Sequence, residues 1–589
     1  MSDPLHLVTT EAHVEQRLET GGFARSRRRW IAAMAALGSA KAAAAEITFL
    51  ATASAASSCA EALGSDPSPA LIRSLDAALG ELRRAGATPS DVESAGGSRA
   101  ALLSRLLRES DRRLEKAGLF DDRAAGFLAA AATAPQAELA EAVVIEGLFD
   151  WDPSSFAWVD ALARRVPVTV RMPRLLGAPP ELAAAPEALL SQLEHRWQNQ
   201  SRGPELELLP LDLPREITLI EGANDAAEAR AIAGGIADAL AAGTPADRVA
   251  VLVPSLDEAF LEPLRAALSE ARIPFQEPRG RPPIAAPAPR AALAWLDFVA
   301  APMDRDTLID LLRTDVVDPG PFIAEPHREA RRRRALGLAR RLSRLPARCD
   351  RQGTLLVDLL KADTANRPDD AWMVDTLSAF ARARGELGRP APRGELLAKL
   401  TEAWRAFGLM DTAERGLSAM LAAPPGGVES HLLAQLLFEE TQGMRALLEA
   451  AQRIEHAAAA LGDAAQPVTV QRLRGELETA LVGVAPTATH RPGSVRIARA
   501  PDMAWLRTEL LFVTRASHAT LEPASYAHPL LDEALTSALP ERRRPLLPSL
   551  RRAAHLTEIL TAMASAARVV VTRSMTDAAG RPALASRLF

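Results

Sequence analysis

The chain has 589 residues, of which 48% are hydrophobic, and its formal net charge is −5. A chain of this length exceeds one hydrophobic core, and we expect roughly three to five domains. The negative net charge excludes a protein that coats nucleic acid over its whole surface, so any nucleic-acid contact is expected in a local groove. Lys41 and Glu46 interrupt the alanine-rich stretch 31–60, so the sequence predicts no membrane span and no membrane partner.

The composition also argues against a metal or cofactor. Cys59 and Cys349 are the only two cysteines, too few for a cysteine-ligated zinc or iron–sulfur site. The ten histidines are scattered and form no H-E-x-x-H pattern. The first residues, Met1 to Leu5, lack the basic start and apolar segment of a signal peptide, which predicts a cytoplasmic protein.

The N-terminal third combines strands with a long helical segment. Residues 5–10 and 46–50 are predicted strands, whereas leucine spacing makes residues 67–133 wholly helical. Strand character returns at 142–147 and 166–170. A proline-rich stretch at 175–214 then has the composition of an irregular linker between two domains.

Residues 215–283 predict a β-α-β-α-β unit, around which the rest of the chain is organised. Its two clear strands, 216–220 and 249–253, are short and apolar, as strands buried on both faces of a parallel sheet should be. Asn224 or Asp225 is the expected N-cap of the intervening helix, and Gly243 its C-terminal stop.

The C-terminal half first becomes helical and then returns to strands. Helical patterns continue to about residue 466, and strands are predicted at 494–498, 510–514 and 568–572. We therefore expect an α/β fold with two parallel-sheet lobes, each interrupted by a helical insertion. The predicted parts are a first lobe at 1–66 and 134–213 with insertion 67–133, and a second lobe at 214–300 and 480–589 with insertion 301–479.

The central unit resembles the start of domain 2A in superfamily 1 helicases of the UvrD/RecB type. The resemblance rests on Glu228-Ala229-Arg230 in the first helix, the strand Val249 to Val253, and Arg272-Ile273-Pro274-Phe275. Shorter patches resemble the AddB/RecC-like, inactivated helicase subunits of bacterial helicase-nucleases, and they occur in order at 114–123, 143–156, 495–523, 529–532 and 577–582.

This resemblance implies two RecA-like lobes and a non-catalytic scaffold subunit in DNA recombination and double-strand-break repair. The implied partners are DNA, as a single strand or a duplex end, and an AddA-like ATP-driven helicase-nuclease subunit.

The residues that a helicase motor requires are missing from the sequence. No G-x-x-x-x-G-K-[ST] loop occurs, and the nearest stretch, Gly21 to Arg27, lacks the lysine. The strand at 142–147 continues into Gly147 to Asp150 rather than an Asp-Glu pair that would bind magnesium. The chain ends about where the family's nuclease domain would begin, and neither Asp369 nor Asp502 precedes an E-x-K strand. We therefore expect no catalytic residues and no intrinsic ATPase or nuclease activity.

Arginine clusters are the candidates for nucleic-acid binding. In single-strand channels, cations follow the phosphates and aromatic rings stack on bases, which favours four residues: Arg499, Trp505, Arg507 and Arg515. The densest basic run, 328–348, is expected on a helix, either as a solvated face paired with acids or as a phosphate-contacting face.

Two other functional classes stay open from the sequence. One is an α/β enzyme that acts on a small nucleotide or sugar, with Gly222 and Gly280 lining a crevice near strand ends. The other is a protein-interaction scaffold that does not bind DNA.

Overall fold

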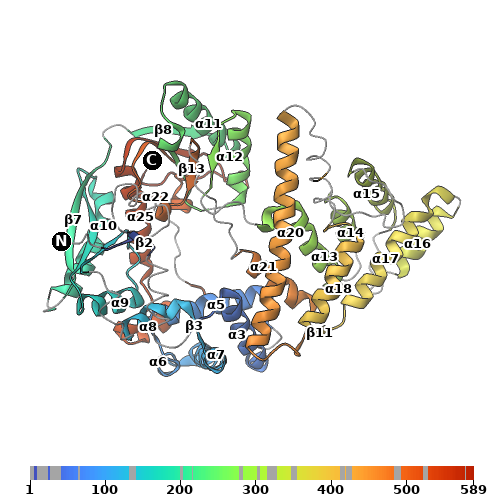
Figure 1. Cartoon of the computed structure of the whole chain (residues 1–589), viewed down its shortest axis with the longest axis horizontal. Coiled ribbons are helices and arrows are strands. Elements are labelled where there is room, and N and C mark those ends of the chain that lie inside the picture. Colours follow the sequence, from blue (N-terminus) through green and yellow to red (C-terminus); the bar gives the residue numbers. More distant parts are fainter. Residues whose placement is uncertain are drawn as a thin grey trace. The chain divides into compact units, whose positions relative to one another are not determined.

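The computed structural model describes residues 5–8, 24–26, 41–63, 67–131, 141–198, 200, 203–214, 217–255, 257–277, 283–300, 305–314, 328–346, 354–365, 367–410, 418, 428–482, 493–521, 528–577 and 579–588. The chain divides into two compact units (Figure 1). Unit 1 comprises residues 1–43, 74–280 and 487–589, and unit 2 comprises residues 44–73 and 281–486. Unit 1 contains two parallel sheets, whereas the described part of unit 2 is almost entirely helical.

The first sheet of unit 1 has five strands in the order β2-β1-β5-β6-β7. They are β1 (Leu5–Val8), β2 (Ala24–Ser26), β5 (Val143–Glu146), β6 (Val168–Leu176) and β7 (Glu205–Asp212), and every neighbouring pair is parallel. In chain order this is 2-1-3-4-5, the order of flavodoxin-like sheets, so the winding direction reverses between β1 and β5.

The second sheet of unit 1 has six parallel strands in the order β10-β13-β9-β14-β15-β8. They are β8 (Ile217–Gly222), β9 (Val249–Leu252), β10 (Phe275–Gln276), β13 (Val495–Ala498), β14 (Thr508–Val513) and β15 (Ala566–Ser574). β10 and β13 are neighbours in the sheet, although residues 283–482, whose described parts are almost entirely helical, lie between them along the chain. The predicted α/β class with parallel sheets is confirmed.

Alternating side chains of this second sheet fill two separate cores. Val249 and Val251 face α11 (Asp225–Ala241) and α12 (Glu258–Glu270), whereas Ala250 and Leu252 face α25 (Pro548–Ala564) and the short α22 (Ala500–Met503). Because successive strand residues point to opposite faces, a strand covered by helices on both sides reads as one continuous apolar run.

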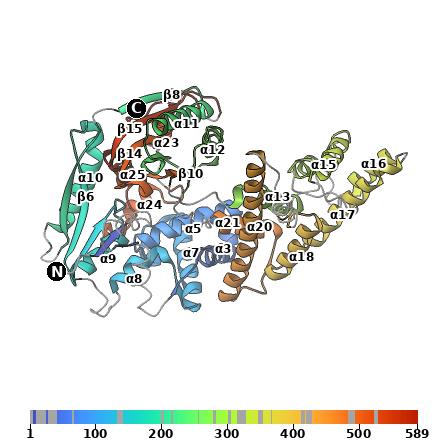
Figure 2. The ribbon, with the colours of Figure 1, turned by 45° about the horizontal axis from the view of Figure 1, so that its top comes forward.

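Two helices connect the cores of the two sheets. α10 (Pro180–Trp197) and α25 pack on each other, and both contribute side chains to the core of each sheet. Figure 2 shows α10 beside β6, and its Leu189 and Leu193 are fully buried against the first sheet. The same core includes α9 (Pro153–Ala163), whose Val159 is also fully buried and whose Asp160 accepts a hydrogen bond from the indole N–H of Trp197 at 2.9 Å.

The remaining described elements of unit 1 are mainly helical. They are β3 (Lys41–Ala42), most of α5 (Pro69–Arg84), α6 (Pro89–Ser94), α7 (Gly97–Lys116), β4 (Leu119–Phe120), α8 (Ala125–Ala131), α23 (His518–Leu521), α24 (Glu533–Ala538) and a 3₁₀ turn at Glu541–Arg543. α7 buries Leu103, Leu106 and Leu107 on one face, which matches the leucine spacing in the sequence.

Unit 2 is built from helices around an aromatic core. Its described helices are α3 (Ala45–Ser58), α4 (Ala60–Leu63), α13 (Pro287–Ala300), α14 (Arg305–Leu312), α15 (Arg328–Leu342), α16 (Thr354–Thr364), α17 (Ala371–Leu387), α18 (Arg393–Ala406), α20 (Val428–Ala460) and α21 (Val470–Val482), with a short β11–β12 pair at 391–392 and 467–468. Four aromatic rings pack together in this core, those of Trp295, Phe298, Phe380 and Phe407. In the part of the chain that the structure describes, no helix is both long and apolar enough to cross a membrane.

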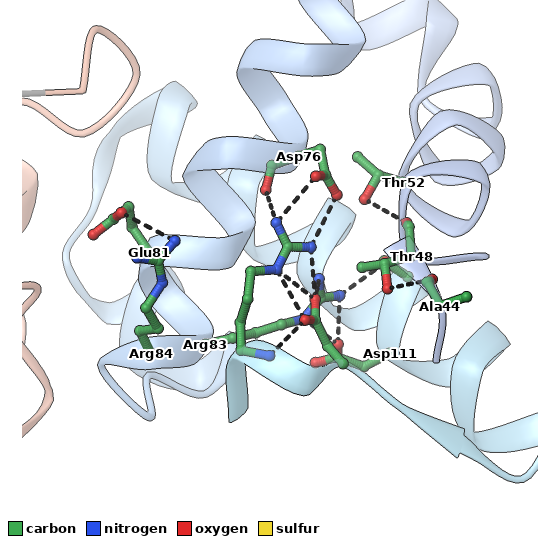
Figure 3. Close-up of polar contacts among 11 residues, drawn as sticks. Ala44, Thr48, Thr52, Asp76, Glu81, Arg83, Arg84 and Asp111 are labelled. Atoms are coloured by element: carbon green, nitrogen blue, oxygen red, sulfur yellow. Dashed lines mark hydrogen bonds and ion pairs between the residues drawn. The ribbon is translucent and has the colours of Figure 1, made fainter. Parts of the chain in front are cut away.

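Two sequence predictions about local structure are wrong. Residues 46–50, predicted as a strand, lie in helix α3, where Thr48 to Ala56 are all buried. A helix buried on every side has no amphipathic pattern, so Ile47 to Leu50 alone resemble a strand. The hydroxyls of Thr48 and Thr52 donate to the carbonyls of Ala44 and Thr48, which satisfies them within the helix (Figure 3).

The stretch 175–214, predicted as an irregular linker, instead contains α10 and β7. Its prolines do not prevent this, because Pro180 occupies the first turn of α10, where the missing N–H costs nothing. β7 pairs in parallel with β6 over eight residues and forms the edge of the first sheet.

Candidate functional site

The carboxyl ends of parallel strands are where α/β proteins usually bind their ligands, and in the second sheet this edge is built around Glu228. Glu228 lies in the first turn of α11 and is completely buried. Its Oε1 accepts hydrogen bonds from the backbone N–H of Arg515, at 2.7 Å, and from the hydroxyl of Thr572, at 2.6 Å. The carboxyl group thereby connects the start of α11 to the ends of β14 and β15.

The other carboxylate oxygen, Oε2, has no hydrogen-bond partner among the described residues. Burial raises the pKa of Glu228, and the hydrogen bonds from Thr572 and Arg515 oppose that rise only in part. The nearby charge of Arg515 also opposes the rise in pKa, but burial outweighs it. The two hydrogen bonds make Glu228 an acceptor that positions this edge.

Gly222, at the end of β8, allows α11 to approach the sheet closely. A Cβ at this position would lie 2.5 Å from the backbone nitrogen of Glu228. The start of the helix is capped by Asn224, whose side chain accepts from the N–H of Ala227 at 2.9 Å, and it carries Asp225 and Glu228. Phosphate sites at helix starts need free N–H groups and a positive field. This helix start is instead capped and acidic.

That geometry bears on the nucleotide or sugar enzyme considered from the sequence. Gly222 serves the packing of α11 rather than a crevice, and Gly280 lies outside the described residues. The observed edge therefore gives no support to that alternative.

The four predicted nucleic-acid-binding residues occupy different parts of the second sheet. Arg499 and Arg515 follow the carboxyl ends of β13 and β14, whereas Arg507 immediately precedes the amino end of β14. Because β13 and β14 both run parallel to β9, Arg507 lies at the opposite edge of the sheet from the other two arginines.

Arg515 is held by its neighbours. The backbone of Arg515 has a positive φ of 52°. Its Nη1 lies 3.1 Å from the carboxylate of Asp257, and its Cζ lies 5.5 Å from the centroid of the Phe260 ring. Arg499 lies at the start of α22, with its Nε 3.8 Å from the carboxylate of Asp502. Both arginines therefore already face acids of the same chain.

Arg507 and Trp505 differ from this pair. Arg507 is exposed, and it makes no hydrogen bond or ion pair with the described residues. Trp505 is half-buried against the core of the first sheet and has a positive φ of 70°, which is unusual for a bulky residue. Its indole N–H is buried and has no partner among the described residues.

A group of acids lies where β5 of the first sheet ends and α25 passes. Asp152 caps α9, accepting from the N–H of Ser155 at 2.7 Å. Burial, and next the charge of Asp150, raise the pKa of Asp152 to about 6. Burial also raises the pKa of Glu558 on α25, with a further upward contribution from Asp150, while His555 and Arg499 oppose it. This group was missed from the sequence, because its members come from three distant segments.

A second polar group sits in the helical part of unit 1. Arg83 of α5 is 5% exposed, and its guanidinium donates to Asp121 at 2.6 Å, Asp111 at 2.6 Å and Ser110 at 2.8 Å (Figure 3). Arg123 also binds Asp121, at 2.7 Å, and reaches Asp76 at 3.0 Å. Burial alone would raise the pKa of Asp121, but the hydrogen bonds and charges of the two arginines hold it below its usual range.

Three members of this group, Arg83, Asp111 and Asp121, line one side of a cavity of about 590 Å³. Its walls also include the half-buried rings of Phe120 and Phe127 and the guanidinium groups of Arg542 and Arg543. Arg543 pairs with Asp91, so opposite charges balance one another around much of the cavity. The cavity therefore has no dominant charge that would select one class of ligand.

No group of three or more histidine, cysteine, aspartate or glutamate side chains within the described ranges could hold a metal ion. Cys59 is buried and forms no disulfide with a described residue, and Cys349 lies outside the described residues. No protein-family model matches the sequence, and a search of curated proteins finds no significant match.

Proposed function

We propose that this protein is a helicase-like scaffold subunit without motor activity, which binds DNA beside an AddA-like ATP-driven partner in recombination and double-strand-break repair. Its two parallel sheets would be RecA-like lobes. The observation that carries the proposal is the pairing of β10 with β13. These neighbouring strands are separated along the chain by residues 283–482, whose described parts are almost entirely helical. A helical insertion into a parallel-sheet lobe is the arrangement that the resemblance to superfamily 1 helicases implies.

The chemistry at the strand ends supports a subunit that does not use ATP. Nucleotide phosphates need backbone N–H groups and a lysine or magnesium ion to offset their charge. The helix that follows β8 begins instead with Asp225 and the buried Glu228, and Asp150 and Asp152 follow β5. The sequence also has no Gly-rich loop with a lysine. Negative groups at these places disfavour a triphosphate.

Among the four candidate DNA contacts, Arg507 has the side chain most accessible to a phosphate. Arg499 and Arg515 are 30% and 19% exposed, and both lie against acids, whereas Arg507 is exposed without such a partner among the described residues. A phosphate at Arg507 would not have to displace an existing ion pair. We therefore expect Arg507 to contribute more to DNA affinity than either of the other arginines.

The test combines ATP turnover with DNA binding by the purified full chain. We expect no ATP hydrolysis with or without DNA, and salt-dependent binding of a fluorescein-labelled oligothymidylate measured by anisotropy. Arg507→Gln should make the dependence of log affinity on log salt shallower by roughly 0.7, the contribution of one phosphate on a single strand. Trp505→Phe, which keeps an aromatic ring, should retain most of the affinity.

Arg108→Gln is the matched control, because Arg108 is also exposed but pairs with Glu93 in the helical part of unit 1. It should leave the salt dependence unchanged. ATP turnover that is stimulated by DNA and persists through purification would contradict the proposal, as would an absence of DNA binding by the parent chain. Capture of an ATP-driven helicase-nuclease from the native organism by the tagged chain would support the partner assignment.

A further inference from the structure

Helix α15 of unit 2 carries an arginine face that is separate from the candidate site. Arg333, Arg340 and Arg344 are exposed, and none of their guanidinium groups makes a hydrogen bond or an ion pair with the described residues. Arg340 follows Arg333 by seven residues, and Arg344 follows by four more in the turn after the helix. These spacings place the three side chains on one face, hereafter the arginine face.

The other arginines of the helix whose side chains are described are engaged elsewhere. Arg341 is buried and lies 2.6 Å from Asp363 and 3.5 Å from Asp370. Arg332 and Arg334 also take part in other polar or electrostatic contacts. Among the described residues, partners are therefore found for these arginines and no acid neutralises the arginine face.

The backbone between these arginines is also accessible. Gly337 lies on the same face, between Arg333 and Arg340, and a Cβ placed there would meet no atom within 4 Å. A ligand can thus approach the helix closely between two guanidinium groups. The three arginines extend along the helix for about 16 Å at 1.5 Å per residue.

We propose that the arginine face of α15 binds the phosphate backbone of nucleic acid. Three unpaired guanidinium groups in a row match a linear polymer with one phosphate per nucleotide, and arginine forms bidentate hydrogen bonds with phosphate oxygens. The surface lies outside the residues assigned to the proposed function, and it is tested by different variants.

An anionic membrane is the other polyanion to consider, and the packing of α15 disfavours it. Helices that lie on membranes insert an exposed apolar face among the lipids. Four apolar residues of α15, Ala335, Leu338, Ala339 and Leu342, are at most 4% exposed, Leu336 is half-buried, and the helix packs on α14. The described apolar residues of the helix therefore leave no exposed apolar face for insertion.

The experiment compares three versions of the full chain in the anisotropy titration over a range of salt concentrations. The triple Gln variant carries Arg333→Gln, Arg340→Gln and Arg344→Gln. It should bind oligothymidylate roughly 100-fold more weakly at about 0.1 M salt. The slope of log affinity against log salt should be shallower by about 2, which corresponds to three lost phosphate contacts. The triple Arg→Lys variant at the same positions should retain most of the slope. A control with Arg99, Arg108 and Arg112 changed to Gln removes equal charge from exposed, paired arginines and should leave the slope as in the parent.

Equal slopes for the parent and the triple Gln variant would overturn the proposal and leave the function proposed above intact, since that function is tested at Arg507. An equal loss of affinity and of salt slope in the control with Arg99, Arg108 and Arg112 changed would also overturn the proposal, because net charge alone would then explain the effect. A third measurement tests binding to vesicles of phosphatidylcholine and phosphatidylserine in equal parts. If the triple Gln variant loses vesicle binding but retains its DNA affinity, the arginine face would be assigned to a membrane instead.

Discussion

The arginines around Arg83 in unit 1 and those on the α15 face in unit 2 show how differently the same residue type is used. Arg83 is 5% exposed and is surrounded by Asp111, Asp121 and Ser110. The three arginines of the α15 face are exposed and have no acidic partner among the described residues. Arginine-rich helices therefore serve internal structure in one region and leave charge available for a ligand in the other.

The difference shows that a basic run in the sequence does not establish a basic surface. The C-terminal cluster at 542–552 looks similar to the α15 run, yet Arg543 and Arg551 pair with Asp91 and Glu81, and Arg544 donates to two backbone carbonyls. Only the distribution of acids in three dimensions separates a neutralised cluster from a free one.

The strongest test of this comparison removes the buried guanidinium. Arg83→Met should destabilise unit 1 by about 3 to 5 kcal/mol, because it leaves the carboxylate of Asp121 buried with less compensation. Urea unfolding followed by tryptophan fluorescence measures the change. Adding Asp121→Asn should recover part of the loss, and Arg108→Met is the exposed control. Similar losses for Arg83→Met and Arg108→Met would remove the distinction between the regions.

Glu228 extends the comparison to a buried acid that makes no ion pair with the described residues. Glu228→Ala should cost on the order of 2 to 4 kcal/mol, since the N–H of Arg515 and the hydroxyl of Thr572 lose their acceptor. Glu228→Gln keeps an acceptor oxygen for both donors and should cost much less, because burial, which raises the pKa of Glu228, penalises the charged form that the amide lacks. Equal destabilisation by the two changes would show that the charged carboxylate is required.

Asp152 gives an intermediate effect that depends on pH. Its pKa is raised from 3.8 to about 6, so the folded protein holds this proton more tightly than the unfolded chain. Its contribution to stability is therefore full below about pH 4, falls as pH rises from about 4 to 6, and becomes a constant cost above about pH 6.

Asp152→Asn keeps a good helix cap and removes the titration. The variant should be more stable than the parent at pH 8, by on the order of 2 kcal/mol, with the difference shrinking toward pH 4. Urea unfolding at several pH values measures both curves. Parallel curves would contradict the assignment of the raised pKa to Asp152.

The smallest effect on stability is expected at the arginine face. The triple Gln variant should unfold at the same urea concentration as the parent, because these guanidinium groups make no hydrogen bond or ion pair with the described residues that unfolding would break. A large loss of stability would show that the face is covered or paired in the folded protein, and the two arginine regions would then be alike.

Much of the second sheet is predictable from the sequence. Short apolar runs mark five of its strands, at 217–222, 249–252, 495–498, 508–513 and 566–574. Asn224 caps the start of α11 as predicted, and Gly243 follows its end with a positive φ of 92°. These signals are local, because a strand buried on both faces and a helix end each require particular residues within a few positions.

The errors occur where local patterns give no signal or a misleading one. α3 is buried on every side, so Ile47 to Leu50 show no helical periodicity. α10 begins at Pro180 and contains Pro186, which made a helix look like a linker. In both segments, packing against other elements outweighs the local preference of a few residues.

The sequence by itself determined the α/β class, the position of most strands in the second sheet, and the lack of a Gly-rich lysine loop, since each depends on residues close together in the chain. The tertiary structure alone decided which charges are free. Glu228 meets Thr572 across 344 residues, Arg83 meets Asp121 across 38, and Arg543 meets Asp91 across 452. Ion pairs and hydrogen bonds act over only a few ångströms, so the availability of an arginine for a ligand depends on which distant segments folding places beside it.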